Sequence, residues 1–117
     1  MRLKRANLCD KKGWYAGPWD SNLGISVGFA NTGVDDPHVH AQVAEIYLVV
    51  RGSAEIRVEQ QTFALSSGDM VIVEPGEAHA FSSSSADYHH FVVHVPGLTG
   101  DSARLDKSSV PRSRLGL

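Results

Sequence analysis

The sequence predicts an all-β protein, folded as a sandwich or a small barrel. Glycine and proline recur along the chain, and most apolar runs between them are short, which is typical of strands joined by turns. Residues 22–30, NLGISVGFA, alternate with the period of two that indicates a strand with one buried side. Helical periodicity is nearly absent before residue 100. We therefore expect about eight short strands, and periodicity alone does not choose between a sandwich and a barrel.

The strands can be assigned in chain order. In 22–30 the four alternating apolar residues from Leu23 to Phe29 share one face, which we expect to be buried. Residues 45–61 follow as two strands joined by a turn near Arg51–Ser53. Further strands are expected at residues 62–65, 70–74, 79–85 and 88–97.

A single domain accounts for the whole chain. With 117 residues, a second domain would leave each half too small to bury a sufficient core. We expect the core over about residues 20–98, with a short lead-in before it and a tail over 99–117 after it. The tail has room for one helical turn around Ala103–Lys107 and is otherwise polar, so it should be mobile or docked on a partner subunit.

Charge and cysteine content exclude several classes of protein. The formal net charge is -2, so there is no basic field to attract nucleic acid or an anionic membrane, and neither is an expected partner. The single cysteine, Cys9, excludes an intramolecular disulfide and favours a reducing compartment. The basic N-terminus lacks the apolar segment of a secretory signal. The expected location is cytoplasmic.

The stretch PHVHAQVAE, which ends at Glu45, contains the first candidate ligands. His38 and His40 are two residues apart on an expected strand, so both side chains project to the same side. The residues between them and Glu45 permit a turn that brings the carboxylate across from the imidazoles. This donor set suits a divalent transition metal such as iron, manganese, nickel or zinc. The triplet is also compatible with three polar side chains on a solvated strand, because H-x-H is common by chance.

A second stretch, GDMVIVEPGEAH, favours the metal site. It contains a turn glycine, a buried strand, a Pro-Gly turn and then His79. A second hairpin that delivers one histidine is what a fourth ligand requires.

The two stretches together resemble the two motifs of the cupin superfamily. The first motif (glycine, H-x-H, three or four residues, E, six residues, G) is matched by His38, His40, Glu45 and Gly52. The second motif (glycine, five residues, P-x-G, two residues, H, three residues, N) is matched by Gly68, Asp69, Gly76 and His79.

Three positions depart from the cupin pattern. Gly33 stands one residue closer to His38 than usual, Glu74 takes the usual proline position with Pro75 shifted by one, and Ser83 replaces the final asparagine. None of these changes removes a ligand.

The resemblance implies a double-sheet jelly-roll β-barrel that holds one divalent transition metal ion inside. The implied ligands are three imidazoles and one carboxylate, from His38, His40, His79 and Glu45, which leave two positions of an octahedral ion for water, oxygen or substrate. Cupins include dioxygenases, isomerases, decarboxylases, sugar-modifying enzymes and non-catalytic binders, so the fold does not select a reaction.

Strand parity suggests residues for a substrate pocket. Tyr47 shares the parity of Glu45, although core packing with a hydrogen-bonded hydroxyl also explains it. Phe81 and Ser83 share the parity of His79, and Ser83 is also compatible with a solvated loop.

Two further polar residues are candidates for roles in binding or catalysis. Arg57 could pair with a substrate carboxylate or be a solvated surface arginine. His94 and Tyr47 are the candidates for proton transfer, although the sequence favours a structural role for His94.

The expected function is that of a small metal-dependent enzyme, either an oxygenase or an isomerase or lyase, acting on a small polar organic molecule. The alternative is a non-catalytic module that binds or senses a small ligand, which the lack of an evident general base favours. A third possibility keeps the barrel and drops the metal.

A homodimer is the expected assembly. Small sandwiches have exposed edges that pairing would cover, and the lead-in and the tail could be exchanged between subunits. Trp14, Tyr15 and Trp19 would cover one end of the barrel or contact the partner.

Overall fold

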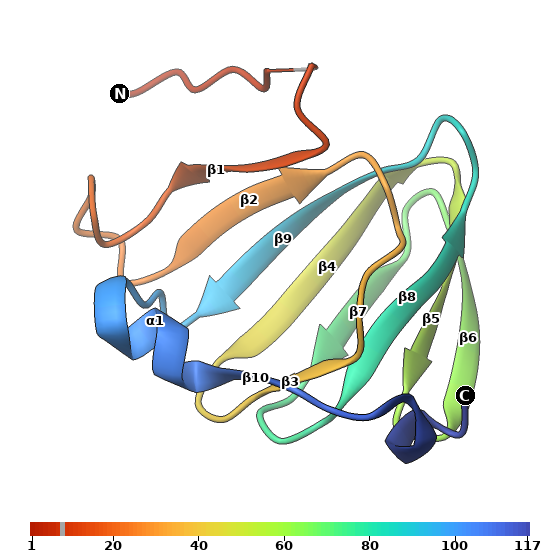
Figure 1. Cartoon of the computed structure of the whole chain (residues 1–117). Coiled ribbons are helices and arrows are strands. Elements are labelled where there is room, and N and C mark those ends of the chain that lie inside the picture. Colours follow the sequence, from red (N-terminus) through yellow and green to blue (C-terminus); the bar gives the residue numbers. More distant parts are fainter. Residues whose placement is uncertain (8) are drawn as a thin grey trace.

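In the computed structural model, which describes residues 1–7 and 9–117, ten strands form two five-stranded antiparallel sheets. The first sheet has the order β1-β2-β9-β4-β7 and the second the order β10-β3-β8-β5-β6, and together they form the walls of a barrel (Figure 1). The predicted all-β jelly roll is confirmed. The strands are β1 Lys12–Ala16, β2 Ser26–Ala30, β3 His38–His40, β4 Ala44–Arg51, β5 Ser53–Val58, β6 Gln61–Ser66, β7 Met70–Val73, β8 His79–Ser84, β9 His89–Val95 and β10 Lys107–Ser109; helix α1 spans Gly100–Asp106 and a 3-10 helix spans Arg112–Leu115.

Strand β4 runs through both the polar site and the apolar core. Glu45, Tyr47 and Val49 alternate on its inner face and are buried, whereas Leu48 and Val50, which follow Tyr47 and Val49, are exposed. This is the period-two pattern of a strand with one covered face. The core beyond Glu45 is a single cluster from both sheets, made of Tyr47, Val49, Ala54, Ile56, Leu65, Val73, Phe81 and Tyr88.

The first predicted strand forms, but of its four alternating apolar residues only Phe29 is buried as expected, and the opposite face points into the barrel. Strand β2 begins at Ser26, and Leu23 before it is exposed. Ser26 pairs with His94 of β9, and both side chains line the central cavity. Because cross-strand partners share a face, Val27 and its neighbour Val93 lie on the outer side. The sequence pattern alone therefore does not show that the face with Ser26 points into the barrel.

The C-terminal residues belong to the same fold. Strand β10 pairs with β3, and α1, β10 and the 3-10 helix run along the lower edge of the barrel in Figure 1. Leu115 is fully buried against Ala78 and Ala80 on the outer side of the second sheet. The segment is therefore docked on its own chain, whereas the sequence suggests mobility or a partner subunit. The lead-in likewise pairs within the chain through β1 and β2.

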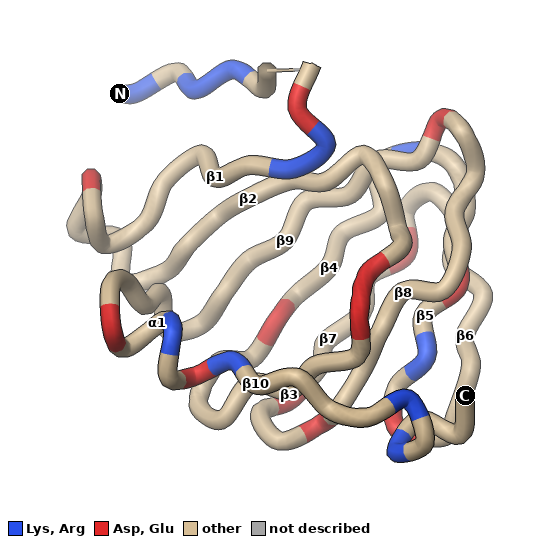
Figure 2. Tube along the Cα trace, in the orientation of Figure 1, with Lys and Arg blue, Asp and Glu red and all other residues tan. Residues whose placement is uncertain are grey.

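Basic residues are concentrated towards the two ends of the chain, and the barrel strands between them carry few (Figure 2). In the described part of the chain, no helix combines the length and the apolar character needed to cross a membrane.

Candidate metal centre

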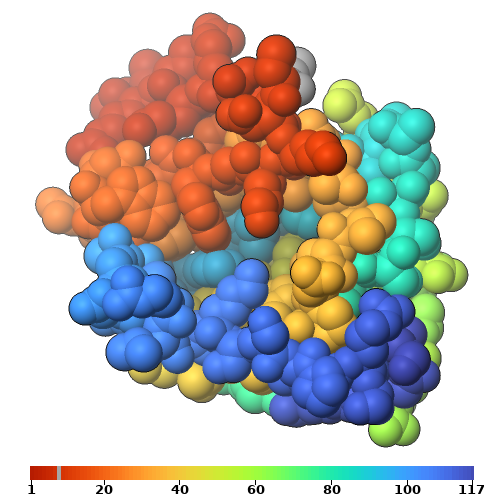
Figure 3. Space-filling view, in the orientation of Figure 1, coloured from red at the N-terminus to blue at the C-terminus, as the bar shows by residue number. Residues whose placement is uncertain are grey.

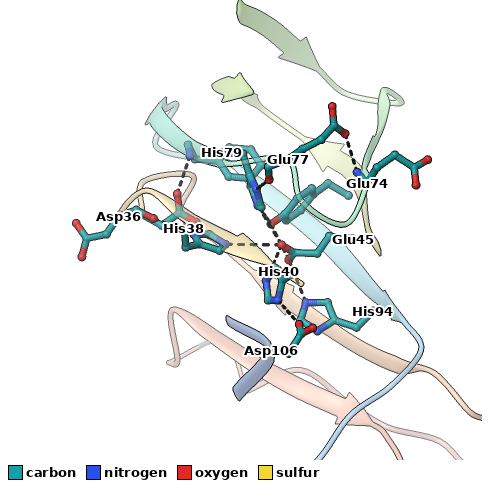
Figure 4. A network of polar contacts seen from close by, with 12 residues as sticks. Asp36, His38, His40, Glu45, Glu74, Glu77, His79, His94 and Asp106 are labelled. Atoms are coloured by element: carbon teal, nitrogen blue, oxygen red, sulfur yellow. Dashed lines mark hydrogen bonds and ion pairs between the residues drawn. The ribbon is translucent and has the colours of Figure 1, made fainter. Parts of the chain in front are cut away.

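Three imidazoles and one carboxylate lie together in one network of polar contacts (Figure 4). His38 and His40 come from β3, and His79, at the start of β8, is the cross-strand partner of His38. Glu45 reaches them from β4 in the opposite sheet. Its Oε1 lies 2.9 Å from Nε2 of His40, 2.9 Å from Nε2 of His79 and 3.6 Å from Nε2 of His38.

Each of the three imidazole rings forms a hydrogen bond through its Nδ1 atom, on the side of the ring away from Glu45. When Nδ1–H donates a hydrogen bond, the neutral ring keeps its lone pair on Nε2, which is the form that binds a metal. All three Nε2 lone pairs then face Glu45 Oε1. The acceptors are the carbonyl of Asp36 for His38 at 2.8 Å, the carbonyl of Glu77 for His79 at 3.2 Å and the carboxylate of Asp106 for His40 at 2.8 Å.

The two oxygens of Glu45 have different surroundings. Oε2 accepts hydrogen bonds from the hydroxyl of Tyr47 at 2.8 Å and from Nε2 of His94 at 3.0 Å. Oε1 is buried and has no hydrogen-bond partner of suitable geometry among the described residues. Burial alone would raise the pKa of Glu45, but in the metal-free protein hydrogen bonds donated by neighbouring histidine rings hold it well below its usual range, so the side chain is a carboxylate.

This arrangement fits a divalent transition metal ion. The potential ligand atoms form two overlapping groups, His38 with Glu45 and His79, and His40 with Glu45 and His94, and within each group they lie within 4.8 Å of one another. Carboxylate oxygens and imidazole lone pairs this close repel one another unless a cation lies between them. Two ligand atoms about 2.1 Å from one ion and at right angles are about 3.0 Å apart. The two 2.9 Å separations at Glu45 Oε1 match that spacing.

The same geometry explains how the charge of Glu45 is balanced within the protein itself. Burial lowers the pKa of His40, but Glu45 and Asp106 outweigh that effect and raise it above its ordinary value. A positive charge is therefore favoured at this point of the barrel. An imidazolium and a metal ion are two ways to supply it.

A cavity of about 660 Å³ leads from solvent to these ligands, which is within the range of small-molecule sites. In Figure 3 it is the hollow between the N-terminal segment, the segment that precedes β3 and the C-terminal α1–β10 segment. Trp14 and Trp19 line it, and both are about half exposed. Their rings meet edge to face at 5.9 Å. The cavity is thus apolar on one wall and carries the ligating atoms on another.

The predicted pocket residues divide into two groups. Tyr47 and Phe81 are buried and line the cavity. Burial and the charge of Glu45 raise the pKa of Tyr47 well above its ordinary value, so its hydroxyl remains a hydrogen-bond donor.

Ser83 and Arg57 lie elsewhere. Strand β8 has a β-bulge between the residues that pair with Glu55 and Ile56, and the bulge reverses which side chains face inward. Ser83 is therefore exposed. Ser84 points inward instead and accepts a hydrogen bond from the Gly33 N–H at 3.0 Å.

The side chain of Arg57 does not point to the inner face of its strand, β5. It donates to the carbonyl of Leu115 at 2.6 Å and to the hydroxyl of Thr62 at 2.8 Å. Its hydrogen bond therefore connects the C-terminal 3-10 helix to β5, and the side chain does not line the cavity.

His94 is the proton-transfer candidate that reaches the site. Besides its bond to Glu45, its ring contacts Trp14 edge to face at 4.8 Å and lines the cavity. The structure adds one residue that the sequence does not suggest, Asp106, whose carboxylate holds His40. No local pattern in the polar tail signals its position, because the contact joins residues 66 apart in the chain.

Comparisons with known proteins agree with this fold. Residues 22–115 match the family model described as the AraC-like ligand binding domain. The chain is 35% identical over 78 residues to an uncharacterised protein of Streptomyces coelicolor, which covers 66% of this chain and 73% of that protein. A variant of Streptomyces Pac13 with uridine is 14% identical with a TM-score of 0.70, over 86% of this chain and 77% of that chain.

A cupin-2 domain protein of Shewanella frigidimarina is 18% identical with a TM-score of 0.59, over 70% of this chain and 76% of that chain. Identities this low show the fold alone, which in both cases is shared. The family model, by contrast, spans most of the sequence. The chain therefore belongs to the AraC-like ligand binding domain family and is a small cupin jelly-roll domain.

Proposed function

We propose that His38, His40, Glu45 and His79 bind one divalent transition metal ion, with iron, manganese, nickel and zinc as the candidates. The observation that carries the proposal is the buried Oε1 of Glu45, which lies among three Nε2 atoms without a properly oriented donor. When bound, the ion would supply Lewis-acid polarisation of a substrate oxygen or activation of dioxygen.

We further propose that the protein is a metal-dependent lyase or isomerase acting on a small polar organic molecule. A neutral His94 that donates from Nε2 to Glu45 keeps its lone pair on Nδ1. That atom can accept a proton from a bound molecule, because the charge of Glu45 stabilises the imidazolium that results. Tyr47 holds the other side of the same carboxylate oxygen and fixes its position.

A neighbouring fold supports this class of reaction. Pac13 is described as a nucleoside dehydratase, and dehydration is a lyase reaction. Oxygenase chemistry would use the same ligands but would not need His94 as a base. The second candidate function is non-catalytic binding or sensing of a small molecule, which the description of the family as a ligand binding domain favours.

Metal binding can be tested with two histidine variants. Zinc and manganese titrations followed by calorimetry should give one site in the wild-type protein. His79→Ala should weaken the affinity at least about 100-fold, since it removes a direct ligand. His89→Ala is the matched control, because His89 is also buried but stacks on Phe29 away from the site. Unchanged stoichiometry and affinity in His79→Ala would refute the ligand assignment.

Turnover can be separated from binding with a substrate screen on metal-loaded protein. Loss of activity in His94→Gln, with metal affinity within about threefold of wild type, would support the base. Substrate-dependent oxygen uptake would favour the oxygenase instead. Binding without turnover across the panel would favour the sensing function.

We also propose that a second copy of the chain covers the outer face of the first sheet. Cross-strand neighbours there are apolar, with Ile46 beside Ile72 and Leu48 beside Met70. Leu48, Met70 and Ile72 are 38%, 56% and 50% exposed. Among the described residues of β4 and β7 that face outward, Arg51 at the end of β4 is the only charged one. Two identical neutral faces can meet without like-charge repulsion, so a copy of itself is a suitable partner.

The oligomeric state tests this surface directly. Light scattering at micromolar concentration should report a dimer for the wild-type protein and a monomer for Leu48→Lys. Leu105→Lys is the control, because Leu105 is 78% exposed on α1, away from this face. A wild-type monomer, or a dimer that survives Leu48→Lys, would rule the surface out.

A further inference from the structure

The carboxylate of Asp106 is buried at the junction of α1 and β10, with 3% of the residue exposed. Burial of a carboxylate is costly unless it is hydrogen-bonded or paired. Among the described residues, its side chain forms no ion pair with a lysine or arginine. Instead Oδ2 lies 2.8 Å from Nδ1 of His40, and Oδ1 accepts the backbone N–H of Gln42 at 2.6 Å.

The backbone around Asp106 holds it in this position from both sides. The carbonyl of Asp106 accepts the N–H of Ala41 at 2.9 Å, and Lys107 is the cross-strand partner of His40. The carboxylate is thus placed by the pairing of β10 with β3. Docking of the C-terminal segment and orientation of His40 are consequences of the same contacts.

The three site imidazoles are not supported in the same way. His38 and His79 each use the backbone carbonyl two residues earlier, from Asp36 and Glu77. The local backbone therefore positions both of these carbonyl acceptors. His40 instead uses a charged side chain from the far end of the chain, so its orientation depends on a residue that can be changed without touching the other two.

We propose that Asp106 is a positioning residue that keeps His40 in the tautomer with the proton on Nδ1 and the lone pair on Nε2. The Nε2 atom then faces Glu45 Oε1 at 2.9 Å, as a ligand must. The contribution to metal affinity rests on the proposed metal site, but the tautomer does not, because the contacts exist between protein groups alone.

Replacement by asparagine reverses the hydrogen bond while conserving size. In Asp106→Asn the side-chain oxygen continues to accept the hydrogen bond from the Gln42 N–H. The amide NH₂ therefore points towards His40 Nδ1. A donor at that position selects the opposite tautomer, with the proton on Nε2. His40 then has no lone pair to offer at the site.

The test uses ¹⁵N NMR of the histidine rings in metal-free protein, titrated upward until the ¹⁵N shifts of His40 show a neutral ring. His40 should carry its proton on Nδ1 in wild type and on Nε2 in Asp106→Asn. Asp101→Asn is the matched control, because Asp101 lies on the same helix but is exposed and pairs with Arg104. A wild-type His40 protonated on Nε2 overturns the proposal without any variant. An unchanged tautomer in a folded Asp106→Asn does the same.

Zinc affinity gives a second and separable readout. It should fall about 10- to 100-fold in Asp106→Asn and stay unchanged in Asp101→Asn. Wild-type protein that binds no zinc, but shows the tautomer change, would refute the metal site and leave the positioning role supported. A tautomer change with unaltered zinc affinity would overturn the role of Asp106 in ligation.

Discussion

Lowering the pH from 7 to 5 should destabilise wild-type protein by about 1.8 kcal/mol more than it destabilises a His90→Asn variant. His90 lies inside the barrel between Tyr47 and Phe81 and is 4% exposed. Burial, together with the nearby His89, lowers its pKa to about 4. Burial and the charge of Asp35 raise the pKa of Tyr88 well above its ordinary value. The Tyr88 hydroxyl therefore stays protonated and donates to Nδ1 of His90 at 2.7 Å.

The sign and size follow from the two protonation states of His90. Between its folded pKa of about 4 and an unfolded pKa of about 6.5, the unfolded chain binds a proton that the native state excludes. Stability is therefore complete above the upper value and is lost as the pH falls towards the lower one. At about 1.4 kcal/mol per unit, the loss is about 0.2 kcal/mol at pH 7 and about 2.0 kcal/mol at pH 5.

Urea unfolding of metal-free protein at the two pH values measures the effect. Other titrating groups are common to wild type and His90→Asn, so they cancel when the two pH differences are subtracted. Asparagine keeps an acceptor for the Tyr88 hydroxyl, which limits other changes. Equal pH dependence in the two proteins would falsify the assignment of a neutral buried His90.

Three further perturbations have expected outcomes. Ile56→Ala, at a fully buried core position of β5, should lower the free energy of unfolding by about 2–5 kcal/mol in urea titrations and leave metal stoichiometry intact; a loss under about 1 kcal/mol would show that the core relaxes around the site. Gly52→Ala should cost more than about 1 kcal/mol, because Gly52 has a φ of 76° and an added Cβ would meet Ser85 Oγ at 2.5 Å; a neutral result would contradict the turn geometry. Zinc at 100 times its dissociation constant should stabilise the fold by about 2.7 kcal/mol and raise the melting temperature, and a chelator should reverse the shift; an unchanged melting curve would oppose a site that exists only in the folded state.

Strand periodicity predicts that His38 and His40 share a face, and the resemblance to the two cupin motifs predicts that Glu45 and His79 join them. His38 and His40 share a face through the two-residue repeat of a strand. Glu45 follows after one turn, and His79 follows a second hairpin. Each step depends on residues close in sequence, and the antiparallel pairing then brings the two hairpins together.

Non-local pairings account for the features that the sequence did not reveal. Strand β10, with the sequence KSS, has three exposed residues and no apolar alternation, so nothing in it signals that Asp106 would reach the site. The side that Ser83 faces was predicted by counting along β8, and one bulge is enough to invert that count. The buried face of β2 depends on its pairing with β9, which the strand's own alternation does not specify.

The unequal support of the three imidazoles has a consequence for how such a site changes in evolution. His38 and His79 are oriented by their own strands, so their geometry is inherited with the barrel. The orientation of His40 is set by Asp106, in the C-terminal segment that pairs with β3 at the edge of the sheet. Substitutions in a chain terminus can thus tune or abolish one coordination position without touching any ligand. Related domains with the same four ligands would then differ in metal affinity according to what stands at the place of Asp106.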